Sequence, residues 1–238
     1  ILKNLSFFIN WHDKSPYPSI YKYEGFVDHY FGDGVLAIFP QGAVSGLKAA
    51  IEFLTCVEDF NQVLITRDQE PIRVGIGLHS GEVIMGVCGG EQSIQCTVIG
   101  DCVNLTARLE GLSARYQTSL VLSHDLHQEA KEHLTYEVRA LEYVRVKGRA
   151  RPVLVYEVLD VLPPERRARL RHTLPLFDNG VKAIRNRAFS EAEVIFEQVL
   201  EIDPDDQVAE LHRNTCGALQ RGEAHIDDQG ASVLEEQR

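Results

Sequence analysis

The strongest constraint on the fold comes from residues 26–39, where two short apolar segments meet at a bend that contains Asp33. Residues 26–31 and 35–39 are rich in aromatic and β-branched side chains, which favour extended strands. The intervening Gly-Asp-Gly is typical of a tight turn, because glycine and aspartate tolerate the backbone angles that such turns need. The pattern predicts an antiparallel hairpin, so we expect the chain to contain a β-sheet.

Composition limits the rest of the architecture and the class of partner. The chain has 238 residues, 44% of them hydrophobic, which is enough for one sizeable core and a small appendage. The formal charge of −11, with no block of Lys and Arg, argues against nucleic acid as a partner. The five cysteines are scattered without a Cys-x-x-Cys pair, which favours a reducing, cytoplasmic environment for this part of the protein. No apolar run approaches the roughly 18 residues of a membrane span, so we expect no membrane insertion in this segment.

The order of the expected elements indicates an α+β fold. Residues 43–68 carry apolar side chains at helical spacing, and Asp101 is a suitable N-cap for a second helix that ends near Tyr116. Residues 72–90 are expected to form another hairpin, with its turn at Ser80-Gly81. The remaining expected elements are an amphipathic helix over residues 1–9, a strand at 119–123, a short helix at 124–131, and strands near 136–147 and 153–158.

Two prolines at positions 163 and 164 mark a change of pattern. Beyond them, the spacing of Gly180, Ala192, Phe196 and Pro204 predicts a tetratricopeptide-like helical hairpin. A single repeat of this kind cannot bury its own apolar face, so we expect it to dock on the main domain or on a partner. The expected domains are residues 1–160, a helical appendage over 161–220, and a polar, disordered tail over 221–238.

Four polar residues stand out as candidates for chemistry. Asp33 is either an ordinary turn residue or a ligand for a cation. Asn104 and Arg108 share one face of the second helix, where the arginine could hold phosphate oxygens or simply form a surface salt bridge. Lys147 precedes a glycine turn and is either a solvated strand-end lysine or a further positive charge at a site. Together, a carboxylate and Arg, Lys and Asn donors are the groups that phosphoryl transfer uses, which indicates a nucleotide substrate.

At these residues the sequence resembles the catalytic domain of class III adenylate and guanylate cyclases. The resemblance covers about residues 1–160 and is similar to the bacterial, cyanobacterial-type, bicarbonate-responsive subgroup. Four separate segments carry it in the family's order and spacing, which makes chance agreement far less probable than for one short pattern. They read GFVDHYFGDGVLAIFP, VGIGLHSGEVIMGVCGG, CTVIGDCVNLTARLEGL and VKGRARPVLVYEVL.

The resemblance implies a ferredoxin-like βαββαβ core that pairs head to tail as a homodimer, with active sites at the interface. It implies that ATP or GTP is cyclised in intracellular signalling: the ribose 3′-hydroxyl attacks the α-phosphorus and pyrophosphate leaves, with two Mg²⁺ or Mn²⁺ ions at each site. By the same resemblance, Asp33 is one of two metal-binding aspartates. Asn104 orients the ribose, Arg108 stabilises the transition-state charge and Lys147 holds the outer phosphates. Family members usually carry a sensor or regulatory domain upstream.

One part of the family pattern does not match. The first metal aspartate normally lies in a Phe-x-Asp-Ile-x-Gly-Phe-Thr segment, and this chain contains no such segment. We expect that the chain is truncated at its N-terminus. The metal aspartate that would act together with Asp33 and the first core strand would then both be missing, and the fragment can be inactive. The alternative is a degenerate cyclase-like domain with a regulatory or dimerisation role.

The residues expected to contact the base are also atypical. His29 stands three residues before the Gly-Asp turn, where adenylate cyclases of this type usually have Lys and guanylate cyclases have Glu. Thr97 stands three residues before Gly100, as in bicarbonate-responsive adenylate cyclases. Histidine and threonine can each donate or accept a hydrogen bond, so the residues leave both purines open. The subgroup resemblance favours ATP, with GTP as the alternative, and motivates the hypothesis of a bicarbonate response.

Overall fold

The computed structural model describes residues 2–10, 17–32, 34–90, 93–145, 152–227 and 229–233. The chain divides into two compact units, Ile1–Tyr136 and Glu137–Arg238, which are described separately. Among the helices of these described ranges, none is both long and apolar enough to span a membrane.

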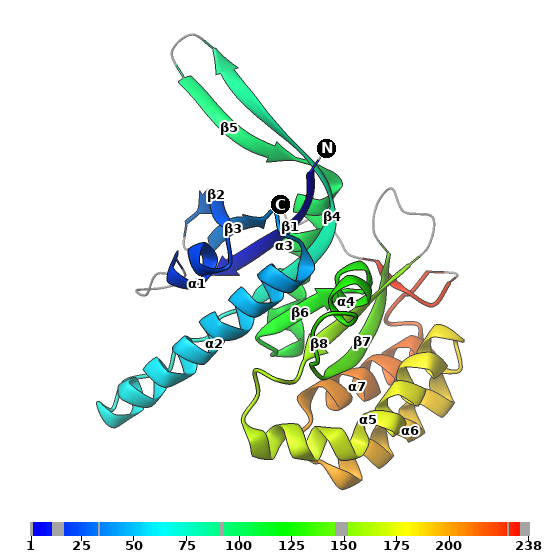
Figure 1. Ribbon diagram of the computed structural model, residues 1–238. Helices are drawn as coiled ribbons and strands as arrows, with labels where there is room; N and C mark the ends of the chain where they lie inside the picture. Colours follow the sequence, from blue (N-terminus) through cyan, green and yellow to red (C-terminus); the bar gives the residue numbers. More distant parts are fainter. Residues whose placement is uncertain are drawn as a thin grey trace. The chain divides into compact units, whose positions relative to one another are not determined.

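The first unit is built around a sheet in which strands lie in the order β2-β3-β1-β4-β6 (Figure 1). Neighbouring strands are antiparallel except for β4 and β6, which are parallel. The first six elements in chain order, β1 to β4, follow the βαββαβ sequence of a ferredoxin-like fold, and their strand order is the one that this fold requires. The elements are β1 (Leu2–Asn10), α1 (Tyr17–Lys22), β2 (Phe26–Phe31), β3 (Gly34–Phe39), α2 (Ala43–Thr66), β4 (Ile76–Gly90), β5 (Ser93–Ile99), α3 (Asp101–Tyr116), β6 (Leu120–Ser123) and α4 (His124–Ala130).

Strand β1 corrects two expectations. The N-terminal residues form a strand and not an amphipathic helix, and this strand occupies the first position of the ferredoxin-like order, so the first core strand is not missing. Leu5 pairs with Phe39 of β3 on one side and with Ser80 of β4 on the other. Pairing on both edges satisfies the backbone donors and acceptors of the segment. The spacing of apolar residues within residues 1–9 contains no information about partners so far along the chain, so it wrongly indicated a helix for this short apolar segment.

Strand β4 corrects a third expectation, because the chain does not turn at Ser80-Gly81. It continues in an extended conformation from Ile76 to Gly90 and returns as β5. Pairing with β1 along residues 76–83 keeps the Ser80-Gly81 pair extended. The outer half of β4 and all of β5 form a two-stranded arm that runs away from the sheet (Figure 1).

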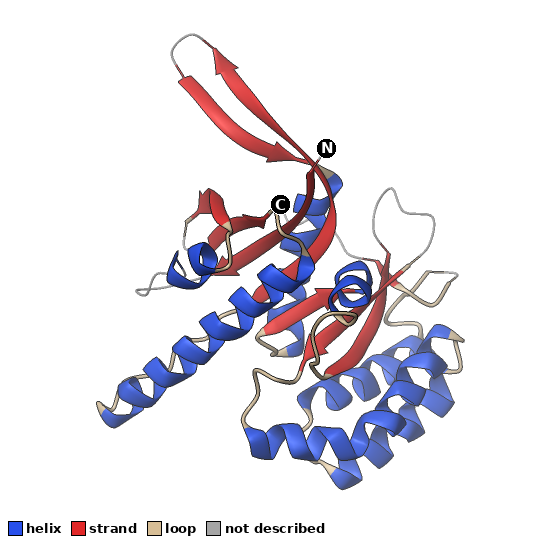
Figure 2. Cartoon of the chain, in the orientation of Figure 1, coloured by secondary structure: helices blue, strands red, loops and turns tan. Residues whose placement is uncertain are grey.

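The core of this unit confirms the other predicted elements. All six residues of β3 are buried, and the hairpin of β2 and β3 forms as predicted. Helix α2 covers the sheet with the apolar face that the sequence indicated, since Leu47 and Ala50 are fully buried. Figure 2 shows the helices of this unit packed beside its strands.

In its described residues, the second unit contains a β-hairpin, three consecutive helices and a short C-terminal strand. Strands lie in the order β8-β7-β9, with β8 antiparallel and β9 parallel to β7. Helix α5 packs on α6, and α6 packs on α7. A Cβ at Gly180 of α5 would lie 2.6 Å from the Phe196 ring of α6, so this glycine allows the close approach of the two helices. The elements are β7 (Val138–Arg145), β8 (Val153–Val158), α5 (Pro164–Arg185), α6 (Phe189–Ile202), α7 (Gln207–Arg221) and β9 (Ser232–Val233).

The compact unit begins at Glu137, because β7 and β8 pack with the helices. The expected domain boundary near residue 160 stays a prediction. One feature of this unit differs from the sequence-based expectation. Residues 222–227 and 229–233 were expected to be disordered, but they fold back and add β9 to the sheet. The three helices confirm a helical C-terminal part, and its tetratricopeptide character stays a prediction.

Candidate active site

Helix α3 carries Asn104 and Arg108, which are four residues apart and therefore share a face. Asn104 is exposed and Arg108 is half-buried, whereas the opposite face of the helix is buried against the sheet. The buried face consists of Cys102, Leu105, Thr106, Leu109, Leu112, Ser113 and Tyr116. The amphipathic pattern of the helix thus fixes both polar side chains on its accessible side.

Glycines of β4 and the segment before it set how closely α3 approaches the sheet. A Cβ on Gly77 would lie 2.5 Å from the Thr106 carbonyl oxygen and 2.9 Å from the Leu109 carbonyl carbon, so any larger residue would push the helix backbone away. A Cβ on Gly75 would collide with the Ser113 hydroxyl in the same way. The glycine spacing of the VGIGLHSGE segment is therefore explained by packing, and it positions the helix that presents Asn104 and Arg108.

His29 lies on β2, next to a break in the regular strand pairing. Val27 pairs with Ala37 and His29 with Leu36, so Asp28 is an extra residue that forms a β-bulge. The Asp28 carboxylate is almost fully buried and lies 3.2 Å from His29 Nδ1, while the imidazole stacks on Phe31 with ring centroids 5.8 Å apart. The bulge therefore directs the histidine and gives it an acidic neighbour. Sequence reasoning missed Asp28, because a bulge leaves no periodic signal.

An apolar cluster joins the elements that carry the candidates. It contains Phe26 of β2, Val98 of β5 and Cys102 of α3, together with Ile38, Val83 and Val103. Strand β5, which includes Thr97, also contacts β2 directly. Helix α3 and the strands of both base-contact candidates thus share one packed core.

Three predicted site residues cannot be placed. Asp33 and Lys147 lie outside the described residues, and Thr97 belongs to β5 but its side chain lies outside them. Within the described part of the chain, no group of three or more His, Cys, Asp and Glu side chains could hold a metal ion. The structure therefore brings Asn104 and Arg108 together and leaves the predicted metal and phosphate contacts untested.

His79, in the same β4 segment, has a structural role. Its imidazole is 1% exposed, and Nδ1 lies 2.8 Å from the Ser123 hydroxyl at the end of β6. The same hydroxyl accepts a hydrogen bond from the Leu126 backbone N–H and caps α4. The contact ties β4 to the β6–α4 junction inside the core.

Comparison with known proteins identifies the family of the chain. The sequence model of the adenylate and guanylate cyclase catalytic domain matches residues 20–159. An adenylate cyclase described as terminal-differentiation specific, from Dictyostelium discoideum, is 29% identical over 215 residues, which covers 88% of this chain and 10% of that protein. An adenylate cyclase from Anabaena cylindrica is 34% identical over 140 residues, which covers 56% of this chain and 28% of that protein. The chain thus spans only a small part of these relatives.

Solved structures agree on the fold. The adenylyl cyclase CyaB from P. aeruginosa superposes with a TM-score of 0.53 at 22% identity, covering 66% of this chain and 93% of that one. A bacterial light-regulated adenylyl cyclase gives a TM-score of 0.60 at 20% identity, covering 71% of this chain and 56% of that one. The family match, which includes β2 with His29 and α3 with Asn104 and Arg108, shows that the chain belongs to the class III adenylate and guanylate cyclase catalytic domains.

Proposed function

We propose that the protein is an adenylate cyclase that converts ATP to 3′,5′-cyclic AMP and pyrophosphate in intracellular signalling. The observation that carries the proposal is the family match over residues 20–159, within which Asn104 and Arg108 lie together on the accessible face of α3. Relatives named adenylate cyclase support the choice of ATP. Because the His29 imidazole can serve either purine, a guanylate cyclase is the second candidate.

In the proposed reaction, the ribose 3′-oxygen forms a bond to the α-phosphorus while the bond from that phosphorus to the bridging oxygen of pyrophosphate breaks. The carboxamide of Asn104 orients the ribose, and the Arg108 guanidinium stabilises the negative charge that grows on the α-phosphate oxygens. Lys147 holds the outer phosphates, and His29 and Thr97 contact the base. All these assignments rest on the family resemblance and on the residue types.

We propose that Asp33 binds a divalent ion, Mg²⁺ or Mn²⁺, with two ions in each complete site. A carboxylate is the ligand that such hard cations prefer, and Asp33 follows Gly32, which adopts a positive φ of 64° at the turn. When bound, the ions would lower the pKa of the attacking hydroxyl and neutralise phosphate charge. Residues 2–10, which occupy the first strand position, contain no second aspartate for this role.

We propose a homodimer as the working unit. Two observations on the β4–β5 arm support it: Ile84 and Ile99 are directly paired across the two strands, and they are 67% and 55% exposed. Paired apolar side chains on a projecting arm favour burial against a second chain. We also propose a cytoplasmic location, which the scattered cysteines favour, and an upstream sensor or regulatory domain of the kind that the family usually carries.

The test is to incubate the purified protein with Mn²⁺ and either ATP or GTP and to separate the cyclic products by chromatography. Cyclic AMP supports the proposal, whereas cyclic GMP keeps the enzyme class and overturns the substrate. The absence of any cyclic product from a folded dimer would favour the degenerate, regulatory alternative. In an active protein, Arg108→Ala should lower turnover strongly and leave the dimer intact. The matched control is Arg115→Ala, at an exposed arginine of the same helix, which should leave turnover unchanged.

The position of Thr97 motivates a separate proposal, that bicarbonate stimulates the activity. The measurement is a bicarbonate titration at fixed pH and constant ionic strength, with chloride as the control anion. Turnover that does not change over the titration would exclude this regulation.

A further inference from the structure

Strand β7 is fastened to the C-terminal helices and tail along its whole length. The residue just before it, Glu137, accepts two hydrogen bonds from Arg171 of α5 at 2.9 and 2.7 Å. Near its far end, the Tyr143 ring lies under the Arg185 guanidinium, 4.0 Å from the ring centroid. Since the family match ends at residue 159, every one of these contacts joins the family domain to a segment that lies beyond the match.

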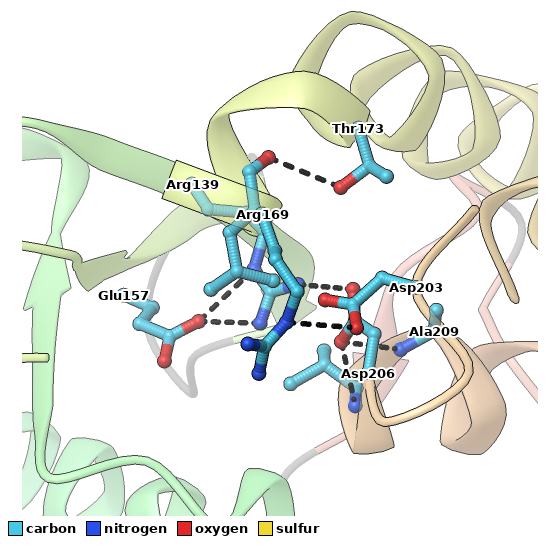
Figure 3. Close-up of polar contacts among 9 residues, drawn as sticks. Arg139, Glu157, Arg169, Thr173, Asp203, Asp206 and Ala209 are labelled. Atoms are coloured by element: carbon cyan, nitrogen blue, oxygen red, sulfur yellow. Dashed lines mark hydrogen bonds and ion pairs between the residues drawn. The ribbon is translucent and has the colours of Figure 1, made fainter. Parts of the chain in front are cut away.

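The centre of the attachment is Arg139, whose side chain is fully buried (Figure 3). Its Nε and Nη2 donate to one oxygen of Glu157 at 3.0 and 2.6 Å, and Glu157 is its direct partner across the β7–β8 hairpin. Its Nη1 donates to Asp206 at 2.6 Å, and its guanidinium stacks on Phe177 of α5, 4.6 Å from the ring centroid. Arg139 thus contacts the hairpin and two helices at once.

Asp206 has two functions in this cluster. One oxygen receives Arg139, and the other accepts hydrogen bonds from the backbone N–H groups of Val208 and Ala209, which caps α7 (Figure 3). The start of α7 is therefore bound to β7 through a single carboxylate. Burial alone lowers the pKa of the Arg139 guanidinium, but the charges of Glu157 and Asp206 outweigh it and raise the pKa.

A buried cluster of one cation and two carboxylates is weak evidence for net stability, because each charge loses its hydration. Such a cluster fixes the relative positions of its residues, because the donors of a planar guanidinium point in set directions and the acceptors must lie along them. The cluster therefore specifies how the hairpin sits on the helices.

The end of β7 is fastened by the C-terminal tail. Arg145, the last residue of β7, donates to the Asp227 carboxylate at 2.6 Å. Asp227 in turn accepts from the backbone N–H groups of Gln229 and Ala231, both at 2.9 Å, so the acceptor is itself fixed. Strand β9 pairs with the same end of β7, Val144 with Ser232 and Arg145 with Val233. The tail thus covers the strand edge immediately before the connection that contains Lys147.

We propose that α5–α7 and the 222–233 tail are a built-in support for the β7–β8 hairpin, and that Arg139 and Asp227 are positioning residues for the cyclase reaction. The proposal rests on the proposed function, because the hairpin leads to Lys147, the residue assigned to the outer phosphates. It makes the helical part an integral component of the catalytic fold and not a detachable interaction module. Loosening the support should weaken the hold on the nucleotide more than it slows the bond-making step.

The test compares variants in the full chain by hydrogen exchange and by steady-state kinetics with ATP. Asp206→Asn keeps an oxygen for the α7 cap and removes the charge that Arg139 binds, and Asp206→Glu restores that charge. The exposed neighbour provides the control, Asp205→Asn. At the other end of β7, Asp227→Asn is matched by Glu223→Gln, which removes an exposed pair with Arg221.

We expect Asp206→Asn and Asp227→Asn to speed hydrogen exchange in β7 and β8 and to raise KM for ATP roughly tenfold, with a smaller change in kcat. We expect Asp206→Glu to restore most of the wild-type protection from exchange in β7 and β8 and most of the wild-type KM. The two control variants should behave like the wild type. If Asp206→Asn does not fold, the Asp227→Asn pair decides the question alone.

Faster exchange confined to α5–α7, with unchanged β7, β8 and KM, would overturn the proposal. If the wild-type protein makes no cyclic nucleotide, the proposed function fails, and hydrogen exchange alone tests whether the helices and the tail support the hairpin. If β7 and β8 stay protected from exchange in Asp206→Asn and Asp227→Asn, the support role is refuted.

Discussion

The Asp28 carboxylate lies 3.2 Å from Nδ1 of His29, and the β-bulge at Asp28 is what brings these consecutive residues together. In a regular strand, adjacent side chains point to opposite faces, so the contact depends on the extra residue. An acidic acceptor at Nδ1 favours the tautomer that carries its proton there, which leaves Nε2 as the ring nitrogen that can accept a hydrogen bond.

This relationship predicts that Asp28 controls base selection through His29. Asp28→Asn should change the ratio of kcat/KM for ATP to that for GTP by about 3- to 10-fold, because an amide can donate to Nδ1 as well as accept from it and therefore no longer fixes the tautomer of the imidazole. The measurement is that ratio, with Asp59→Asn on the exposed side of α2 as the control. An unchanged ratio in a folded variant would remove Asp28 from the specificity determinants.

A second prediction concerns the close contact between β4 and α3. Gly77→Ala should destabilise the protein by about 1–3 kcal/mol, because the new methyl group collides with the helix backbone. The shift of α3 should also lower turnover, since it carries Asn104 and Arg108. The control is Gly86→Ala, where the added Cβ would have no neighbour within 4 Å. Equal urea midpoints for the two variants would show that the helix tolerates displacement.

A third prediction concerns the stability of the second unit. Arg139→Met should lower the free energy of unfolding by about 3–5 kcal/mol, because Glu157 and Asp206 would stay buried without their cation. Arg171→Gln removes the exposed ion pair between α5 and Glu137, the residue before β7, and should have a much smaller effect. Urea titration of both variants at neutral pH measures the difference, and equal losses would contradict a special role of burial.

A fourth prediction follows from Asp178 on α5. Burial raises the pKa of its carboxyl above the ordinary value, although Lys182 and Arg139 partly oppose this, and Oδ1 has no hydrogen-bond partner among the described residues. The folded state therefore holds the proton more tightly than the unfolded state does. The resulting stability is fully present below the unfolded pKa of about 3.9 and is lost as pH rises through the higher folded pKa.

Asp178→Asn should abolish that loss. Relative to the wild type, the variant should gain stability as the pH rises from about 4 to 7, because it has no carboxylate to desolvate. Urea midpoints at several pH values measure the difference, with Asp205→Asn as the exposed control. A constant difference between variant and wild type over this range would show that the Asp178 pKa is not raised.

The local sequence pattern was sufficient to predict those elements whose structure depends mainly on residues close together in the chain. The hairpin over residues 26–39 followed from its Gly-Asp-Gly turn, and the helices that begin at Ala43 and Asp101 followed from their apolar spacing and, for the second, its N-cap. Because these elements formed as predicted, Asn104 and Arg108 share a face of α3, which is all that the sequence could assert about their relative position.

Pairing between distant segments decided the rest. Residues 2–10 are a strand because β3 and β4 offer two open edges, and β4 passes straight through Ser80-Gly81 because β1 holds it extended. The attachment of β7 to Asp206 and Asp227 joins residues 67 and 82 positions apart, a separation over which no periodicity survives. The sequence by itself determined the family, the short-range elements and the residue types of the site. Only the tertiary structure decided the bulge at Asp28, because the bulge depends on the register between β2 and β3. It alone also decided the central strand and the buried cluster at Arg139, because hydrogen bonds and charges there find partners that lie far away along the chain.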